Sequence, residues 1–155
     1  MDSQDAAEYP ACEFLIIGFG PAGRGAVVHL EGVRDRVIVV DLSPAGIASA
    51  EGMGFRAELG DASSGEVLEH LHLDHLRLVV ITLPSRNEAL AVLHLIRTLA
   101  PQATKIVRSR NQIHMSEFLN AGADIVVGDE EEVRKALAST VHEQYLRLAA
   151  IEAAS

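Results

Sequence analysis

The stretch Phe14-Leu15-Ile16-Ile17-Gly18-Phe19-Gly20-Pro21-Ala22-Gly23 decides the fold of this chain. Its first four residues are apolar and predict a buried strand, and the glycines after them have the spacing G-x-G-x-x-G. At that spacing the first glycine permits a tight turn, the second lets the backbone approach a phosphate, and the third lets a helix pack closely on the strand. Backbone N–H groups at the start of such a helix point toward the anion. The stretch therefore predicts a strand, a phosphate-binding turn and a helix, in that order.

Apolar runs rich in β-branched residues recur along the rest of the chain. They predict strands over 37–40, 54–58 (a weaker pattern), 78–81, 105–107 and 124–127. Segments with helical spacing separate them, over 22–30, 44–51, 64–71, 86–99 and 113–121. Because nearly continuous apolar strands alternate with helices, we expect a parallel sheet that is covered on both faces. The predicted fold class is α/β: a doubly wound, six-stranded Rossmann sheet with strand order 3-2-1-4-5-6 and a long C-terminal helix.

The length of 155 residues suits one domain. We expect a flexible N-terminal segment over 1–11, a nucleotide-binding domain over 12–128 and a terminal helix over 129–155. The helix carries an apolar stripe at spacings of three and four, formed by Val133, Leu137, Val141, Tyr145 and Leu148. Two interpretations stay open: the stripe packs on its own sheet, or it crosses to a second copy and forms a dimer.

The composition argues against several classes of protein. The formal net charge of −9 argues against nucleic-acid binding, which normally uses a basic surface, and against docking on an anionic membrane. The apolar runs are far shorter than the ~20 residues of a membrane-spanning helix. Residues 1–10 lack the apolar segment of a signal peptide. The one cysteine, Cys12, forms no disulfide within the chain, which favours a reducing compartment.

A carboxylate stands where a dinucleotide site would need one. Asp41 lies 18 residues after Gly23, at the end of the predicted second strand. There it would accept hydrogen bonds from ribose hydroxyls and repel a 2′-phosphate, so NADP is disfavoured. Arg24 follows the third glycine and either pairs with a phosphate or is a solvated helix residue.

Six segments, the glycine stretch among them, carry a resemblance to a known family. They are residues 15–24, 39–44, 60–63, 79–84, 106–111 and 119–124. Over about residues 13 to 140 the chain resembles the N-terminal domain of the regulator-of-potassium-conductance proteins (RCK, also called TrkA-N). The Kef-type members, which are linked to potassium/proton antiporters, are the most similar. The segment Gly60-Asp61-Ala62 is the most specific part, because ordinary dehydrogenases do not carry it at the third strand.

The resemblance implies a function and a set of site residues. Such domains bind NAD(H), AMP, ADP or ATP, form homodimers, and gate potassium channels or potassium/proton antiporters from the cytoplasmic side. It therefore implies a cytoplasmic regulatory domain, not an enzyme, with no nucleic-acid partner, no metal and no direct membrane insertion. The cofactor-binding residues that it implies are Gly18, Phe19, Gly20, Pro21, Ala22, Gly23, Arg24, Asp41, Leu42, Ser43, Asp61, Ala62, Thr82, Leu83 and Arg108.

One position departs from the family pattern. Many members, especially those that bind ATP, carry an arginine directly after the second glycine, where this chain has Pro21. Proline offers a γ-phosphate neither a cation nor an N–H group. We therefore expect AMP or NAD(H) as the ligand in preference to ATP or ADP.

Two other functions fit parts of the sequence. The glycine stretch and Asp41 would also suit a small NAD-dependent oxidoreductase or a fragment of one, although no Tyr-x-x-x-Lys pair is present. The striped terminal helix and Pro21 would suit a dimerisation scaffold with an empty site. His70, His72, Asp74 and His75 lie close together, and we favour a solvated loop over a metal site there.

Overall fold

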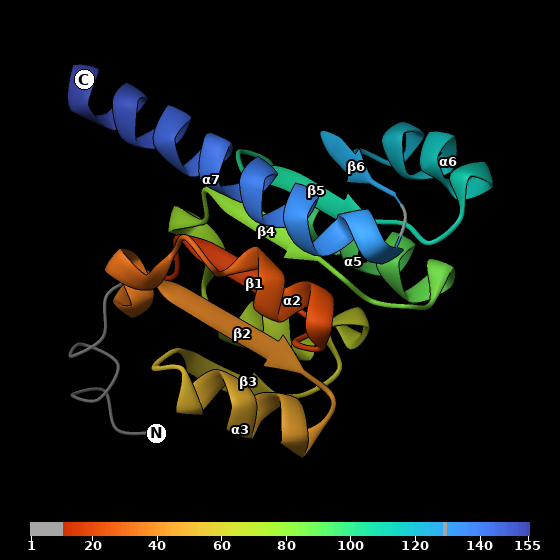
Figure 1. Ribbon diagram of the computed structural model, residues 1–155, viewed down its shortest axis with the longest axis horizontal. Helices are drawn as coiled ribbons and strands as arrows, with labels where there is room; N and C mark the ends of the chain where they lie inside the picture. The colour runs from red at the N-terminus through yellow and green to blue at the C-terminus, as the bar shows by residue number, and fades with distance from the viewer. Residues whose placement is uncertain (1–10, 129) are drawn as a thin grey trace.

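A parallel sheet forms the centre of the computed structural model, which describes residues 11–128 and 130–155 (Figure 1). Its strand order is β3-β2-β1-β4-β5-β6, and all neighbouring strands run parallel. The strands are β1 Phe14–Ile17, β2 Val37–Asp41, β3 Arg56–Leu59, β4 Leu78–Ile81, β5 Thr104–Arg108 and β6 Ile125–Val127. The predicted fold class and strand order are confirmed. Residues 1–10 of the predicted flexible segment lie outside the described residues.

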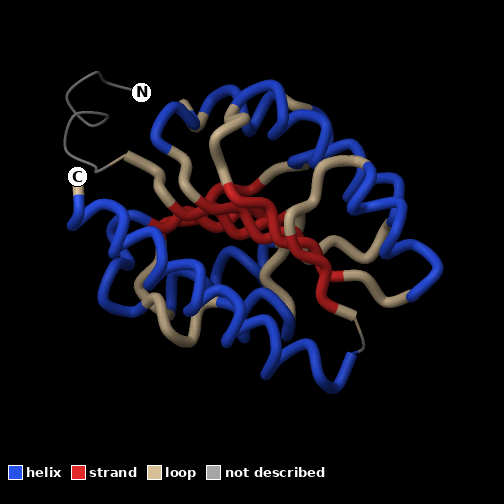
Figure 2. Tube along the Cα trace, turned by 90° about the horizontal axis from the view of Figure 1, so that it is seen from above, coloured by secondary structure: helices blue, strands red, loops and turns tan. Residues whose placement is uncertain are grey.

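Helices cover both faces of the sheet, as Figure 2 shows. The α-helices are α2 Pro21–Ala26, α3 Pro44–Gly52, α4 Glu66–His70, α5 Arg86–Leu99, α6 Met115–Asn120 and α7 Glu130–Ala154. Short 3-10 helices stand between them: η1 Glu31–Arg36, η2 Ala62–Ser64, η3 Leu73–His75 and η4 Gln112–His114. Among residues 11–128 and 130–155, no helix combines the length and apolar composition that crossing a bilayer requires.

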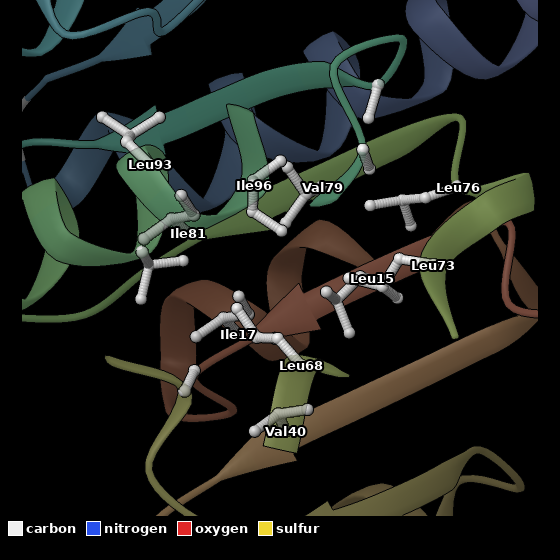
Figure 3. Packing of buried hydrophobic residues seen from close by; sticks show 14 of the residues in the cluster. Leu15, Ile17, Val40, Leu68, Leu73, Leu76, Val79, Ile81, Leu93 and Ile96 are labelled. Carbon is white, nitrogen blue, oxygen red and sulfur yellow. The ribbon is translucent and has the colours of Figure 1, made fainter. Parts of the chain in front are cut away.

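The two faces of the sheet hold separate apolar clusters, because successive strand residues point to opposite sides. Leu15 and Ile17 of β1 lie in one cluster with residues of α4, α5 and α6, part of which Figure 3 shows. Phe14 and Ile16 lie in the other, with residues of α2, α3 and α7. All four β1 residues are fully buried or nearly so, which explains their continuous apolar run.

Side chains and glycines fix the ends of several helices. Ser43 caps α3 by accepting a hydrogen bond from the Ala45 N–H, with Pro44 in the first helical position. Ser85 caps α5 in the same way, accepting from the Glu88 N–H. Gly122 follows α6 with φ +113°, a positive φ that glycine adopts readily just after a helix. These caps set where the loops at the carboxyl edge of the sheet begin.

Three predicted helices are shorter in the structure. The helix predicted over 22–30 ends at Ala26, and hydrogen bonds of i→i+3 type then carry the chain through Leu30. Val27 and Leu30 are nevertheless fully buried, so their apolar spacing imitated a longer helix. The helix predicted over 64–71 covers Glu66–His70, because Gly65 takes a left-handed φ of +88°. The helix predicted over 113–121 covers Met115–Asn120.

The terminal helix α7 packs on its own sheet. Leu137 and Val141 are fully buried in the second cluster, and the Tyr145 ring meets the Phe14 ring edge-on at 5.8 Å between centroids. This is the first of the two interpretations of the stripe; the side chain of Val133 lies outside the described residues. Crossing of α7 to a second copy stays a prediction.

Candidate functional site

A cavity of about 1030 Å³ opens at the carboxyl ends of the strands. Its lining comes from the residues that end or follow β1, β2, β3, β4 and β5. β1 pairs with β2 on one side and with β4 on the other, so the chain order reverses here. In open α/β sheets this reversal is where ligands bind, because the loops on its two sides diverge.

The glycine turn forms one wall of the cavity. Gly18 has φ +90°, and a Cβ there would lie 2.3 Å from the Thr82 Oγ1 atom. A Cβ on Gly23 would lie 2.1 Å from the Gly18 carbonyl oxygen, so only glycine lets α2 pack this closely on the turn. A Cβ on Gly20, in contrast, would have no heavy atom within 4 Å. The first and third glycines are therefore required by the fold, whereas the second leaves open space beside the cavity.

Asp41, the last residue of β2, holds this turn from one side. Its Oδ2 atom accepts a hydrogen bond from the Phe19 N–H at 2.7 Å, and its Oδ1 atom accepts one from the Ser43 N–H at 2.8 Å. A Cβ on Gly46 would lie 2.3 Å from Oδ2, so α3 also packs closely on the carboxylate. An ionised carboxylate has about four acceptor positions, which leaves capacity for ligand hydroxyls.

The segment Gly60-Asp61-Ala62 forms the cavity wall beyond β3. Asp61 is the N-cap of η2, and its Oδ1 atom accepts from both the N–H and the hydroxyl of Ser63, at 2.9 and 2.6 Å. Ala62 is buried, and all three residues of the segment line the cavity. A Cβ on Gly60 would lie 2.4 Å from a methyl group of Val67, so glycine is needed where this wall meets α4.

Thr82 and Arg108 stand on the other side of the turn. The Thr82 hydroxyl lies 2.9 Å from the Ile17 carbonyl oxygen and 3.0 Å from the Gly18 carbonyl oxygen. Arg108 ends β5, and its Nη2 atom donates to the Thr82 carbonyl oxygen at 2.7 Å. Both residues line the cavity although their exposed fractions are only 5% and 8%. The turn is thus held between β2 and β4.

The predicted site residues come together around this cavity. All of them line it except Gly23, which lies behind the turn and packs on Gly18. Sequence analysis missed Ile17, Val40, Ala45, Gly46, Gly60, Pro84, Glu88 and Arg110, which also line it. Gly46 could have been predicted, because it lies in the first turn of a predicted helix that follows Asp41, the last residue of a predicted strand. Contact of these residues with a nucleotide stays a prediction.

Charged side chains of both signs line the cavity. Asp41 and Asp61 stand on the side of β2 and β3, whereas Arg108 and Arg110 stand on the side of β5, and Glu88 lines the cavity from α5. Arg24 lines the cavity from α2 and is exposed, which fits either of the interpretations left open for it.

The other candidate residues form no comparable site. Among the described residues no group of three or more histidine, cysteine, aspartate or glutamate side chains is arranged to hold a metal ion. His70, His72, Asp74 and His75 are all exposed. Burial raises the pKa of the Cys12 thiol to about 12, which keeps it protonated at neutral pH.

Comparison with known proteins identifies similar chains. The family model described as the TrkA-N domain matches residues 14–129. A protein of Alkalimonas amylolytica named as a K(+) efflux antiporter, KefB, is 32% identical over 127 residues, which are 82% of this chain. The matched region is 19% of that protein, so this chain spans about a fifth of its length.

Solved structures share the fold. The NAD(P)-binding domain of an exopolyphosphatase-related protein from Archaeoglobus fulgidus is 29% identical, with a TM-score of 0.68, over 85% of this chain and 98% of that one. The Shewanella denitrificans Kef CTD in its AMP-bound form has a TM-score of 0.66 at 19% identity, over 92% of this chain and 94% of that one. At that identity the second likeness shows the fold alone.

Proposed function

This chain belongs to the TrkA-N family, and from that premise we propose that its cavity is a regulatory site for an adenine nucleotide, either AMP or NAD(H). The observation that carries the proposal is the glycine turn held open at the cavity by Asp41, with unfilled space beside Gly20. A phosphate is the ligand that such a turn suits, because backbone N–H groups approach it without an intervening side chain.

The charges of the lining support the orientation of the ligand. Asp41 and Asp61 face the half of the cavity where ribose hydroxyls would donate hydrogen bonds, and Asp41 disfavours the 2′-phosphate of NADP. The turn and Arg24 would contact the phosphates. Leu42, Ser43, Ala62 and Leu83 would complete the apolar and polar walls around the nucleoside. The cavity volume admits either ligand, so the proposal names both.

Similar structures support an adenine nucleotide as the ligand. The Kef CTD structure is described as AMP-bound, and another similar structure is described as a GsuK channel bound to NAD. Pro21 occupies the first position of α2 and is exposed at the cavity, where it offers a further phosphate no N–H group. GsuK is also described as bound to ADP, so our preference for AMP or NAD(H) over ATP and ADP rests on Pro21 and not on the relatives.

The proposed role is regulation rather than catalysis. The relative named as a potassium efflux antiporter supports a place in potassium transport, with this domain as a homodimer on the cytoplasmic side of a channel or antiporter. Nucleotide would act by binding one arrangement of the dimer better than another, which shifts the population that the transporter senses. Turnover of NADH with a small substrate by the purified chain would contradict the regulatory role.

The test is nucleotide binding with a matched pair of glycine variants. Gly20→Val places a side chain in the open space at the cavity, whereas Gly32→Val places one on exposed η1, and neither added Cβ would have a heavy atom within 4 Å. Isothermal titration with AMP, NADH, ATP and NADP should show AMP or NADH binding to the wild type and to Gly32→Val. We expect Gly20→Val to bind about tenfold or more weakly, which is about 1.4 kcal/mol or more.

Thermal unfolding supplies an independent readout. A nucleotide present at about one hundred times its Kd should stabilise the wild type by about 2.7 kcal/mol. The proposal fails if none of the four nucleotides binds or stabilises the wild type. It also fails if Gly20→Val binds as tightly as Gly32→Val.

A further inference from the structure

The position of the Thr82 side chain is set by the glycine turn and not by the cavity. Its hydroxyl carries a single hydrogen, which the Ile17 and Gly18 carbonyl oxygens share at 2.9 and 3.0 Å. The Thr82 N–H also donates to the Ile17 carbonyl oxygen, at 2.9 Å. With 5% of the residue exposed, the hydroxyl has its donor committed to the backbone of the turn.

Arg108 holds Thr82 in turn. β5 lies beside β4, with Val107 opposite Ile81, so the next residue along each strand brings Arg108 close to Thr82. The Nη2 atom of Arg108 donates to the Thr82 carbonyl oxygen at 2.7 Å, and only 8% of Arg108 is exposed. A charged donor to a buried carbonyl forms one of the stronger hydrogen bonds in proteins.

These contacts converge on one peptide group. The Gly18 carbonyl oxygen meets the Thr82 hydroxyl, while the next N–H group, that of Phe19, donates to Asp41. The same carbonyl lies against Gly23 of α2, where even a Cβ would not fit. The Gly18–Phe19 peptide is therefore held from β4, from β2 and from α2 at once.

We infer that Thr82 and Arg108 are positioning residues: Arg108 fixes the Thr82 backbone, and the Thr82 hydroxyl fixes the glycine turn in its binding conformation. The ligand part of this inference rests on the function proposed above. A turn that is already ordered loses less conformational freedom on binding, so the two residues raise nucleotide affinity through the turn, whereas the resemblance implied direct contacts with the ligand. They also connect the β5 side of the sheet to the phosphate subsite.

The test compares two variants that differ by one hydroxyl. Thr82→Ser keeps the hydroxyl and Thr82→Ala removes it. Thr82→Val makes the same comparison if Thr82→Ala does not fold, because valine keeps the volume and lacks the oxygen. In the ligand-free protein, hydrogen exchange of the Gly18 and Phe19 amides should be roughly threefold to tenfold faster in Thr82→Ala than in Thr82→Ser. The AMP Kd should rise by a similar factor, while Thr82→Ser stays near the wild type.

Arg108 is tested in combination with Thr82. Arg108→Met alone should weaken AMP binding, and Thr82→Ala with Arg108→Met should bind within about twofold of the weaker single variant, because both act on the same turn. If the two losses multiply, Arg108 contacts the ligand by itself and the inference is overturned. Equal amide exchange in Thr82→Ala and Thr82→Ser also overturns it. A wild type that binds no nucleotide refutes the proposed function, while the exchange measurement still decides the positioning role.

Discussion

Replacement of Gly23 by alanine probes the contact between α2 and the glycine turn. A Cβ at this position would lie 2.1 Å from the Gly18 carbonyl oxygen and 3.0 Å from its carbon, which are backbone atoms that cannot rotate away. α2 would have to move off β1 by about an ångström, and overpacking of this kind costs about 1–3 kcal/mol. Alanine would regain up to ~1 kcal/mol through its higher helix propensity. Because the overpacked atoms belong to the backbone, we expect a cost of about 2–3 kcal/mol and therefore a net loss of about 1–2 kcal/mol.

The assay is thermal and urea unfolding of Gly23→Ala beside Gly20→Ala. In a domain of about 150 residues, each kcal/mol shifts the Tm by about 2–4 °C, so Gly23→Ala should melt about 2–8 °C below the wild type. Gly20→Ala adds the same methyl group in the same turn, where no heavy atom lies within 4 Å, and should change the Tm by no more than ~2 °C.

Nucleotide binding gives the second half of the prediction. Displacement of α2 moves the helix start away from the turn, so Gly23→Ala should also bind AMP more weakly than the wild type. A Gly23→Ala protein with wild-type Tm and wild-type AMP affinity would refute the reasoning, because it would mean that α2 does not rest on the Gly18 carbonyl.

Three further variants or reactions test other parts of the structure. Leu137→Ala removes a fully buried side chain of α7 and should lower the free energy of unfolding by about 2–5 kcal/mol. Leu146 is 51% exposed, so Leu146→Ala should change that free energy by less than ~0.5 kcal/mol, and equal losses in urea unfolding would contradict the packing of α7. The side-chain hydrogen bond from Arg86 lowers the pKa of Glu117, so this exposed pair stabilises the fold at neutral pH and its contribution is lost as the pH falls through that lowered pKa. Arg86→Gln should return the Glu117 pKa toward its ordinary value in an NMR titration, and an unchanged titration would show that the pair does not form. Burial raises the pKa of the Cys12 thiol to about 12, so in the folded protein this thiol should resist an aromatic disulfide reagent at pH 8 and should react fully in denaturant. Fast reaction of the folded protein would contradict that burial.

Some helices and strands could be predicted from local sequence, because their local conformational preference agrees with their burial in the folded domain. β1 and β4 match their predicted bounds, since each is a run of four apolar residues that the sheet buries on both faces. α5 also matches its predicted bounds, because Ser85 caps its start and Pro101 stands just beyond its end. The strand order follows from the alternation of strands and helices together with the glycine stretch.

Other features depend on contacts between distant segments. Glu88 and Arg110 line the cavity from different elements, and only the folded sheet brings them together. α2 ends at Ala26 although the apolar spacing continues, because Val27 and Leu30 reach the core through i→i+3 turns. The link from Arg108 through Thr82 to Gly18 joins three strands, and no spacing within one segment encodes it.

The attachment of α7 has a mechanical consequence. The helix is about 37 Å long, and its buried residues Leu137 and Val141 rest on the second cluster beside α2. Near its far end Arg77, which precedes β4, donates to the Leu148 carbonyl oxygen at 2.6 Å and pairs with Glu152. Because it is held at two separated points, α7 cannot move independently of the sheet. A movement of α2 would therefore tilt the whole helix about the Arg77 contacts, and loss of these contacts would free the far end of the helix.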